Sequence, residues 1–516
     1  MTNKLLEKTG LNRQGFSSFF LILTVAILTR LPYFFETDID WDESTFILLG
    51  QSVLDGHLPY TDLLDVKPPL HWYIFTSIIW LAQHSFVFLR FLGAMIVALI
   101  GLINYEIASR IWNKKAGLIS GILVIFLIDL NPGGQSIMSE HLALVPMMLS
   151  FALILFCPKN NSAFIVSGLC MGLAIMIRLN LAYVGLFTGL YILFVSIEND
   201  FPKYKLILLP GVFFALGNLA SILVTLLPHL ITDNLEALNI GLIKASLNYS
   251  QQSDFLNVIV NQLGFVADIL AMTISIAFSV VFGPTLFFAI SQLIQVQKQE
   301  QKLNFFEKRF YTIGILFGLS IEFSILRTSV FYKHYVIQFL PMAALLAAPA
   351  IANFLDRKDN LKKQLVAIVL SVLLVHFSLQ YYKTGSYCLN SPSCLHGTSI
   401  TVKHYLAEHN PLNGNIWLTR GHLAYWFAGV TPITPLVTHP SNINKRFLLE
   451  SWYGQEATLS QEIDKIFAKK PVLIIGASLQ DYLHDSTAQA RLDDFIQSDY
   501  VELPALGKLH IYQRQG

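Results

Sequence analysis

Carboxylates crowd into one stretch near the N-terminus, DIDWDESTFILLGQSVLDGHLPYTDLLDVKPPLHWY, which spans residues 38–73. The interval between Arg30 and Arg90 contains the acidic residues Glu36, Asp38, Asp40, Asp42, Glu43, Asp55, Asp62 and Asp65. Lys67 is the one lysine or arginine within this interval. A carboxylate can take a proton from an attacking hydroxyl or amine, and a fixed cation can stabilise a departing phosphate. The stretch therefore contains the residue types that group transfer from a phosphate leaving group requires.

The spacing inside this stretch predicts the elements that hold these side chains. The run after Asp42 and Glu43 has helical spacing, which puts both carboxylates in the first turn, where the helix dipole favours negative charge. Gly56 ends this helix. The two prolines after Lys67 hold the lysine in an extended conformation and open the next helix.

A simpler interpretation is that the loop is merely acidic and that Lys67 pairs with Asp62 or Asp65. The functional interpretation is favoured by further polar residues at the expected outer membrane edge, namely Glu140, His141, Arg178, Arg327, Lys333, His334 and Tyr335. Ionisable residues at membrane depth are costly and usually mark a function. Structural alternatives stay open, since Arg178 can extend to the interface and His334 can bond a helix start.

The composition predicts a protein that crosses a membrane many times. The 516 residues are 54% hydrophobic and only 13% charged, and the net charge of +1 provides no bulk positive field for nucleic acid. A spanning helix needs roughly 20 apolar residues. This length predicts about eleven spans, near 16–34, 86–109, 116–131, 138–157, 162–178, 180–197, 206–228, 263–293, 310–326, 335–354 and 364–382. The run 69–85 is predicted to be an interfacial helix instead.

The distribution of lysine and arginine predicts the orientation of these spans, because basic residues concentrate in inner loops. With the N-terminus inside, residues 35–85 and 229–262 lie outside, and an odd number of spans puts 384–516 outside as well. We therefore expect a transmembrane domain over 1–383, with 35–85 as its first outer loop, and an extracytoplasmic soluble α/β domain over 384–516.

The C-terminal part has the mixed pattern of an α/β domain. NIWLTR and PVLIIGAS predict strands, and SQEIDKIFAKK and TAQARLDDFIQ predict helices. Its large aromatics either stack on sugars or, as is commoner, fill the core: Trp417, Tyr425, Trp426, Trp452 and Tyr453. Cys388 and Cys394 are close enough in sequence for a disulfide. No strong metal motif is visible, although His57, Glu140 and His141 would suit a divalent ion if they came together.

The pattern DE followed by VLDGHLPYTDLLDVKPPL resembles the first outer loop of GT-C glycosyltransferases, of the protein O-mannosyltransferase-like and aminoarabinose–lipid A transferase-like families. SRIWNKKAG after a predicted span, Glu140 at the start of another, and HYVIQFLP at 334–341 extend the resemblance. The resemblance is a match in motif over residues 38–71 and a match in architecture alone over the rest of the chain. The resemblance implies a polytopic α-helical membrane protein of GT-C type with a C-terminal extracytoplasmic α/β domain.

The resemblance also implies transfer of a sugar from a polyprenyl-phosphate donor. Asp42 matches the leading catalytic acid of these families, a general base for an inverting attack, and Glu43 matches its neighbour. Glu140 matches a second acidic position that orients donor or acceptor. Relatives often have tyrosine where this chain has Phe46, so no hydroxyl acts there. The implied donor-phosphate residues are Lys67, Arg178 and His334.

The expected partners are a polyprenyl-phosphate sugar donor, a lipid, glycan or protein acceptor, and membrane lipid, with no nucleic acid and no required cofactor. Short inner loops favour the inner (plasma) membrane, with the active site on the extracytoplasmic side.

The main alternative is a transporter or flippase of lipid-linked sugars, for which the sequence has no convincing inverted repeat. An oligosaccharyltransferase would need a WWDYG-like signature, and SWYG at 451–454 is only superficially close. A non-catalytic assembly partner would not need the acids and Lys67. The sequence identifies neither sugar nor acceptor.

Overall fold

The computed structural model describes residues 13–158, 160–198, 208–251, 255–273, 275–298, 302–328, 330–391, 393–409 and 414–515. The chain divides into two compact units, each assembled from segments that are distant in sequence. Unit 1 comprises Met1–Phe34, Arg90–Thr225 and Ser253–Thr384, and unit 2 comprises Phe35–Leu89, Leu226–Gln252 and Gly385–Gly516. The acidic first loop thus shares a unit with the C-terminal part of the chain.

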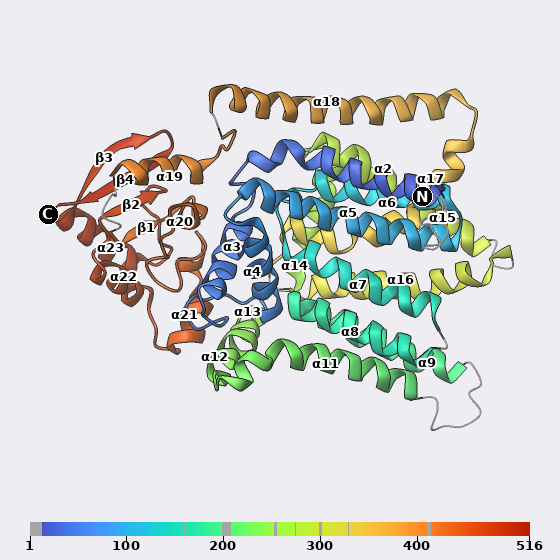
Figure 1. Cartoon of the computed structure of the whole chain (residues 1–516), viewed down its shortest axis with the longest axis horizontal. Helices are drawn as coiled ribbons and strands as arrows, with labels where there is room; N and C mark the ends of the chain where they lie inside the picture. The colour runs from blue at the N-terminus through green and yellow to red at the C-terminus, as the bar shows by residue number, and fades with distance from the viewer. Residues whose placement is uncertain are drawn as a thin grey trace, which may run out of the picture. The chain divides into compact units, whose positions relative to one another are not determined.

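Unit 1 is a bundle of helices (Figure 1). Its elements are α2 (Arg13–Arg30), η1 (Leu31–Phe35), α5 (Phe86–Ile111), α6 (Lys114–Leu130), α7 (Ser139–Phe156), α8 (Asn161–Ile177), η2 (Leu179–Leu181), α9 (Ala182–Glu198), α11 (Leu209–Ile231), α14 (Phe255–Leu270), α15 (Ile276–Lys298), α16 (Phe305–Leu326), η5 (Lys333–Gln338), α17 (Leu340–Asp356) and α18 (Asn360–Asn390). Helix α17 packs against α6 and α15. Its many alanines are buried and allow these neighbours to approach closely.

The predicted count of about eleven spans is not confirmed. In the described residues, seven helices are long and apolar enough to cross a membrane, or up to eight if the bent pair Leu235–Gln251 and Phe255–Leu270 forms one span. Every predicted span does contain a helix, but α6, α8, α9 and α17 have only 17 residues each. Such a helix is about 26 Å long, short of a hydrocarbon core of about 30 Å. The run predicted at 69–85 is helical but is not a candidate span.

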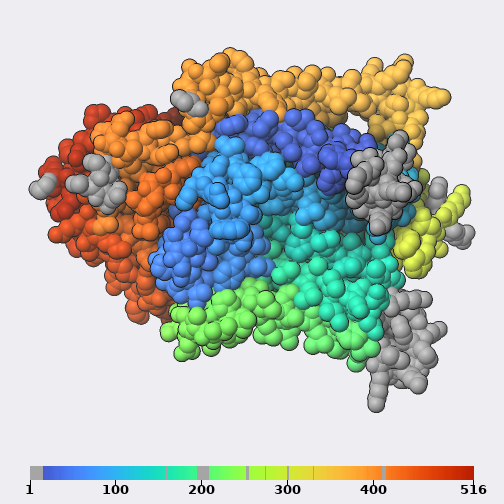
Figure 2. All heavy atoms as spheres, viewed as in Figure 1, coloured from blue at the N-terminus to red at the C-terminus, as the bar shows by residue number. Residues whose placement is uncertain are grey.

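Helix α18 lies along the N-terminal span. Figure 2 shows its atoms beside those of α2, and Tyr381 donates a hydrogen bond to the Leu28 carbonyl at 2.7 Å. Thr384 similarly donates to the Pro32 carbonyl at 2.8 Å. Cys388, in the last turn of this helix, forms a disulfide with Cys394.

Unit 2 combines short helices with one sheet. Its helices are α3 (Trp41–Leu54), α4 (Pro69–Ala82), α12 (Leu235–Leu238), η3 (Asn239–Lys244), α13 (Ala245–Gln251), α19 (Thr398–His409), α20 (Leu423–Ala428), η6 (Asn442–Asn444), α21 (Arg446–Tyr453), α22 (Leu459–Ala468) and α23 (Ser486–Asp499). Its strands are β1 (Ile416–Leu418), β2 (Leu473–Gly476), β3 (Tyr500–Leu506) and β4 (Leu509–Arg514). The strands predicted from NIWLTR and PVLIIGAS are β1 and β2, and the two predicted helices are α22 and α23, so these four predictions are confirmed.

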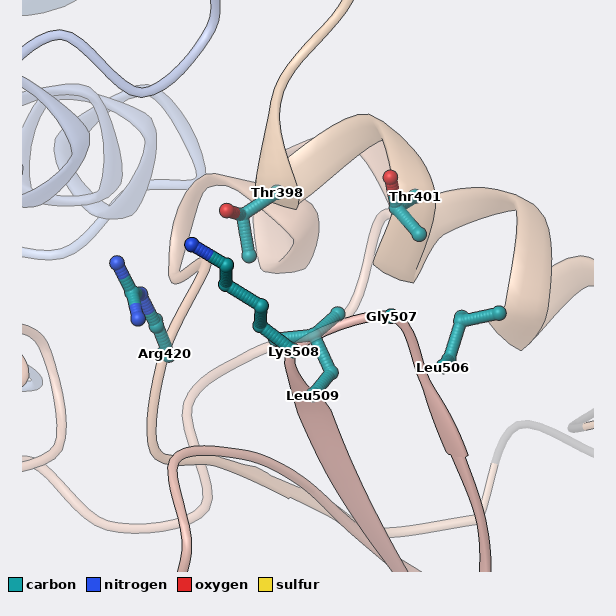
Figure 3. Close-up of a pocket in the computed structure, with 7 residues that line it drawn as sticks. All are labelled: Thr398, Thr401, Arg420, Leu506, Gly507, Lys508 and Leu509. Carbon is teal, nitrogen blue, oxygen red and sulfur yellow. The ribbon is translucent and has the colours of Figure 1, made fainter.

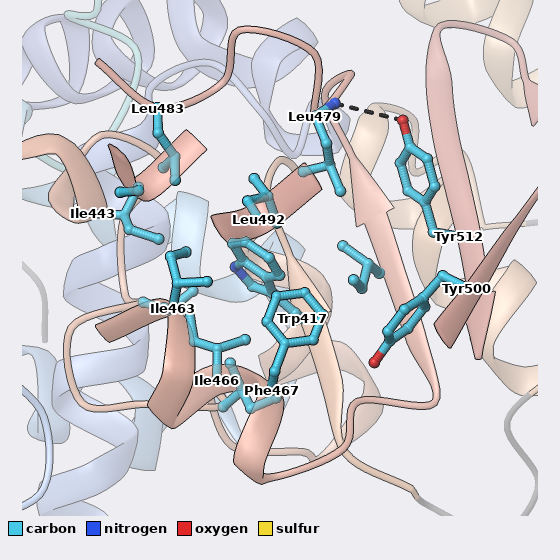
Figure 4. Packing of buried hydrophobic residues seen from close by; sticks show 14 residues of the cluster. Trp417, Ile443, Ile463, Ile466, Phe467, Leu479, Leu483, Leu492, Tyr500 and Tyr512 are labelled. Carbon is cyan, nitrogen blue, oxygen red and sulfur yellow. Dashed lines mark hydrogen bonds between the residues drawn. The ribbon is translucent and has the colours of Figure 1, made fainter. Parts of the chain in front are cut away.

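The sheet has the order β1-β2-β4-β3, with β1 parallel to β2 and the other pairs antiparallel. Its core gathers around Trp417, which packs edge-on against Phe467 (Figure 4). Trp417, Tyr425 and Trp426 are buried, as a core role requires. Tyr453 is exposed and is covered by the ammonium of Lys465 instead.

Candidate active site

The first turn of α3 carries the two acids that the sequence predicts there. The Asp40 side chain caps the helix by accepting a hydrogen bond from the Asp42 amide at 2.9 Å. Glu43 is only 1% exposed, whereas the Asp42 side chain is 29% exposed. Of the two predicted acids, Asp42 is therefore the one that a substrate can reach. Helix α3 ends as predicted, with Gly56 at a φ of 103°.

The backbone of Lys67 is fixed by three hydrogen bonds. Its amide donates to Asp65 Oδ1 at 2.9 Å, and its carbonyl accepts from the Tyr60 hydroxyl at 2.6 Å and from Trp72 Nε1 at 3.0 Å. The ammonium lies 5.1 Å from the centre of the Phe46 ring. Asp65 thus holds Lys67 through its backbone amide.

A second cation reaches these acids from the C-terminal part of unit 2. Burial lowers the pKa of Lys445, while the charges of Asp42 and Asp65 act in the opposite direction. Burial likewise raises the pKa of Asp65, and the charges of Lys67 and Lys445 oppose that rise. One electrostatic group of two acids and two cations is therefore formed by Asp42, Asp65, Lys67 and Lys445.

His439 also comes from the C-terminal part, and its Nε2 lies 3.4 Å from Asp42 Oδ1. Its segment docks on the first loop, because Thr45 donates a hydrogen bond to the Thr438 carbonyl at 3.0 Å. Sequence reasoning missed both His439 and Lys445. The only signal was the polar run HPSNINK at 439–445, which no local pattern connects to α3.

Unit 1 contains the other three predicted site residues, which meet around Glu140. This carboxylate is fully buried in the first turn of α7. Its Oε1 lies 2.7 Å from Arg178 Nη1, at the end of α8, and 3.7 Å from His334 Nε2, in η5. The Arg178 guanidinium also covers the Tyr335 ring at 4.4 Å and donates to Ser139 Oγ at 2.8 Å. Arg178 is therefore held inside a polar cluster rather than extended to the interface.

Two buried arginines fix the loop that leads into α7. Arg30 pairs with Asp129 at 2.7 Å and donates to the Gly134 and Gln135 carbonyls at 2.8 and 2.6 Å. Arg90 donates to the same Gln135 carbonyl at 2.8 Å. Carbonyl groups buried in this turn are thereby satisfied, and the start of α7, with Glu140, is held in place.

The predicted site residues thus form two groups, which belong to different units. Asp42, Glu43 and Lys67 lie in unit 2, and Glu140, Arg178 and His334 lie in unit 1. Among the described residues, no group of three or more histidine, cysteine, aspartate or glutamate side chains is arranged to hold a metal ion.

A separate hollow of about 310 Å³ lies at the turn between β3 and β4. It is lined by Thr398, Thr401, Arg420, Leu506, Gly507, Lys508 and Leu509, and Figure 3 shows the Lys508 and Arg420 side chains directed to the same end. None of the residues that line it belongs to the predicted site.

A family model described as dolichyl-phosphate-mannose-protein mannosyltransferase matches residues 66–227. The match includes Lys67, Glu140 and Arg178. The predicted resemblance to polyprenyl-phosphate-dependent glycosyltransferases is confirmed. The predicted enzyme class, a membrane glycosyltransferase, is confirmed with it. No curated protein sequence matches the chain.

Solved structures show the GT-C type of fold in this chain. ArnT from Cupriavidus metallidurans bound to undecaprenyl phosphate aligns over 97% of this chain and 98% of that chain, with a TM-score of 0.61 and 12% identity. ArnT in the apo state aligns over 95% and 97%, with a TM-score of 0.58 and 11% identity. The Archaeoglobus fulgidus oligosaccharyltransferase in the apo form aligns over 97% and 74%, with a TM-score of 0.46 and 12% identity. The ArnT likeness supports the GT-C type of fold.

Proposed function

We propose that the chain transfers a sugar from a polyprenyl-phosphate donor to an acceptor hydroxyl or amine at the outer face of the plasma membrane, with Asp42 as the general base. The observation that carries this proposal is the group of Asp42, Asp65, Lys67 and Lys445 in unit 2. It combines a solvent-accessible carboxylate with two cations, as transfer from a phosphate requires. The fold likeness to ArnT bound to undecaprenyl phosphate supports a donor of this class.

The proposed reaction is a single in-line displacement that inverts the anomeric carbon. The acceptor oxygen or nitrogen forms a bond to the anomeric carbon while the bond from that carbon to the phosphate oxygen breaks. The bonding electron pair leaves with the polyprenyl phosphate, and the acceptor proton passes to Asp42. Because the phosphate gains charge as it departs, cations beside it stabilise the transition state more than the ground state.

The exposure of the two acids supports Asp42 rather than Glu43 as the base. A general base must come within hydrogen-bonding distance of the proton that it takes. Asp42 is partly exposed, whereas Glu43 is buried beside it. We therefore assign proton transfer to Asp42 and support of the first turn of α3 to Glu43.

Lys67 and Lys445 are proposed to share the donor phosphate. Lys67 is suited to this role because its backbone is fixed and its ammonium lies over an aromatic ring. Arg178 and His334 stay candidates for further phosphate or sugar contacts. Their common contact with Glu140 supports an orienting role for that acid, since it fixes both side chains.

The composition of unit 2 supports a location on one side of the membrane. Its three segments, 35–89, 226–252 and 385–516, nearly coincide with the three segments that the basic-residue distribution predicts to lie outside. The donor would therefore be used in the outer leaflet, and the acceptor would be a lipid, a glycan or a protein exposed there.

The proposal is tested by donor turnover. The purified protein in lipid is given a panel of polyprenyl-phosphate sugars and a membrane extract that supplies acceptors, and free polyprenyl phosphate is measured by mass spectrometry. Release from one sugar donor supports the proposal and identifies that sugar. If no donor is consumed and polyprenyl phosphate does not bind, a transporter or flippase becomes the better account.

A further inference from the structure

His439 contacts the proposed base directly, although it lies far from it in sequence. The two side chains approach to 3.4 Å between Nε2 and Asp42 Oδ1, and both belong to unit 2. The imidazole is 12% exposed, so it is largely shielded from water. No feature of the family resemblance pointed to this residue, and the contact is created by folding alone.

The hydrogen bonds of His439 determine which ring nitrogen carries the proton. Nδ1 lies 3.1 Å from the Ser441 amide, which can only donate, and 2.9 Å from the Ser441 hydroxyl. Nδ1 is therefore an acceptor, and the neutral ring carries its hydrogen on Nε2. That hydrogen faces Asp42.

The surroundings hold the ring in this position. Pro440 restricts the His439 backbone to extended conformations. The Trp41 ring packs edge-on against the imidazole at 5.9 Å between centroids, and Thr45 holds the preceding carbonyl. The orientation toward Asp42 is thus fixed from three directions.

The charged neighbours leave Asp42 as the partner of this imidazole. The histidine nearby, His422, is buried, which lowers its pKa to about 3, so its ring is neutral at physiological pH. Asp65, Lys67 and Lys445 interact with Asp42 or with one another. An Nε2–H donor therefore faces a carboxylate that also has cations nearby.

We infer that His439 is a positioning residue, which donates a hydrogen bond from Nε2 to Asp42 and thereby aims the carboxylate at the acceptor. The inference rests on the proposed role of Asp42 as general base. His439 keeps its own proton throughout, while the acceptor proton passes to Asp42. A residue of the C-terminal part would then be required for chemistry in the first loop, so that neither segment is active without the other.

The test compares His439→Ala and His439→Gln with the wild-type protein, using the polyprenyl-phosphate sugar that the wild type consumes. A hydrogen bond to a charged group is worth a rate factor of roughly 10 to 100, so His439→Ala should lower kcat by that factor. The KM for the donor should stay within about twofold, because the residue does not touch the phosphate. Glutamine can donate from a similar position and should restore most of kcat. The matched control is His484→Ala, which removes an exposed histidine of the same unit.

The pH profile separates positioning from a purely structural role. A hydrogen bond to the charged form of a carboxylate favours that form. Its loss in His439→Ala should move the acidic limb of the rate profile to higher pH, and His439→Gln should move it back. If His439→Ala matches His484→Ala in kcat and pH profile, the inference is overturned while the proposed function stands. If the wild-type protein itself consumes no donor, both are overturned.

Discussion

The buried pair of Glu140 and Arg178 gives the sharpest prediction on stability. The two side chains are 0% and 7% exposed, and their charged atoms are 2.7 Å apart. Removal of one partner from such a pair leaves a buried charge without compensation, at a cost of about 3–5 kcal/mol. Glu140→Met and Arg178→Met should each destabilise the protein by about this amount.

The double variant shows whether the two charges act as a unit. Independent effects would add to about 6–10 kcal/mol, whereas removal of both charges should cost about as much as a single substitution. Unfolding is followed by titration with sodium dodecyl sulfate in mixed micelles. The control is the exposed pair Glu106 and Arg110, whose side chains are 56% and 62% exposed, and whose loss should cost about 0.2–1 kcal/mol. Additivity within about 0.5 kcal/mol at Glu140 and Arg178 would refute the reasoning.

The remaining predictions concern the two proposed phosphate cations. Lys67→Ala should raise the KM for the donor by roughly 10- to 100-fold, whereas Lys403→Ala should not, although Lys403 covers Phe427 much as Lys67 covers Phe46. An unchanged KM in Lys67→Ala would contradict the phosphate role. Because burial lowers the pKa of Lys445 below 10.5, its charge is lost at lower pH than that of an ordinary lysine, and donor affinity should fall as pH rises through that range. Lys445→Arg stays charged there and should abolish this fall. An identical alkaline profile in the two proteins would exclude Lys445 from the phosphate site.

The local features of the site could be predicted from the sequence because they depend on short-range rules. The first turn of α3, its end at Gly56 and the start of α4 at Pro69 all follow from caps, glycine and proline. Each of the eleven predicted spans contains a helix, because an apolar run of this length can satisfy its backbone hydrogen bonds in a membrane as a helix. Their number as full spans is not confirmed, because composition does not reveal where each helix begins and ends, and four of the helices have only 17 residues.

The long-range features could not be predicted. Asp42 and His439 meet only because the first loop and the C-terminal part fold into one unit, and no periodicity encodes that. The pairing of Arg178 with Glu140 could not be predicted either, since a salt bridge between two helices depends on how they pack. The buried Trp417 and Tyr425 were expected in the core on general grounds, and the structure agrees.

The most direct test of the central claim is the transfer rate of Asp42→Asn relative to Asp55→Asn. Both variants remove one carboxylate from the same loop, and Asp55 is exposed at the end of α3. General-base catalysis contributes a factor of roughly 10² to 10⁴, so Asp42→Asn should lose at least about a hundredfold in kcat with donor binding intact. Asp55→Asn should retain the wild-type rate. Equal rates in the two variants would show that Asp42 is not the base and would contradict the account.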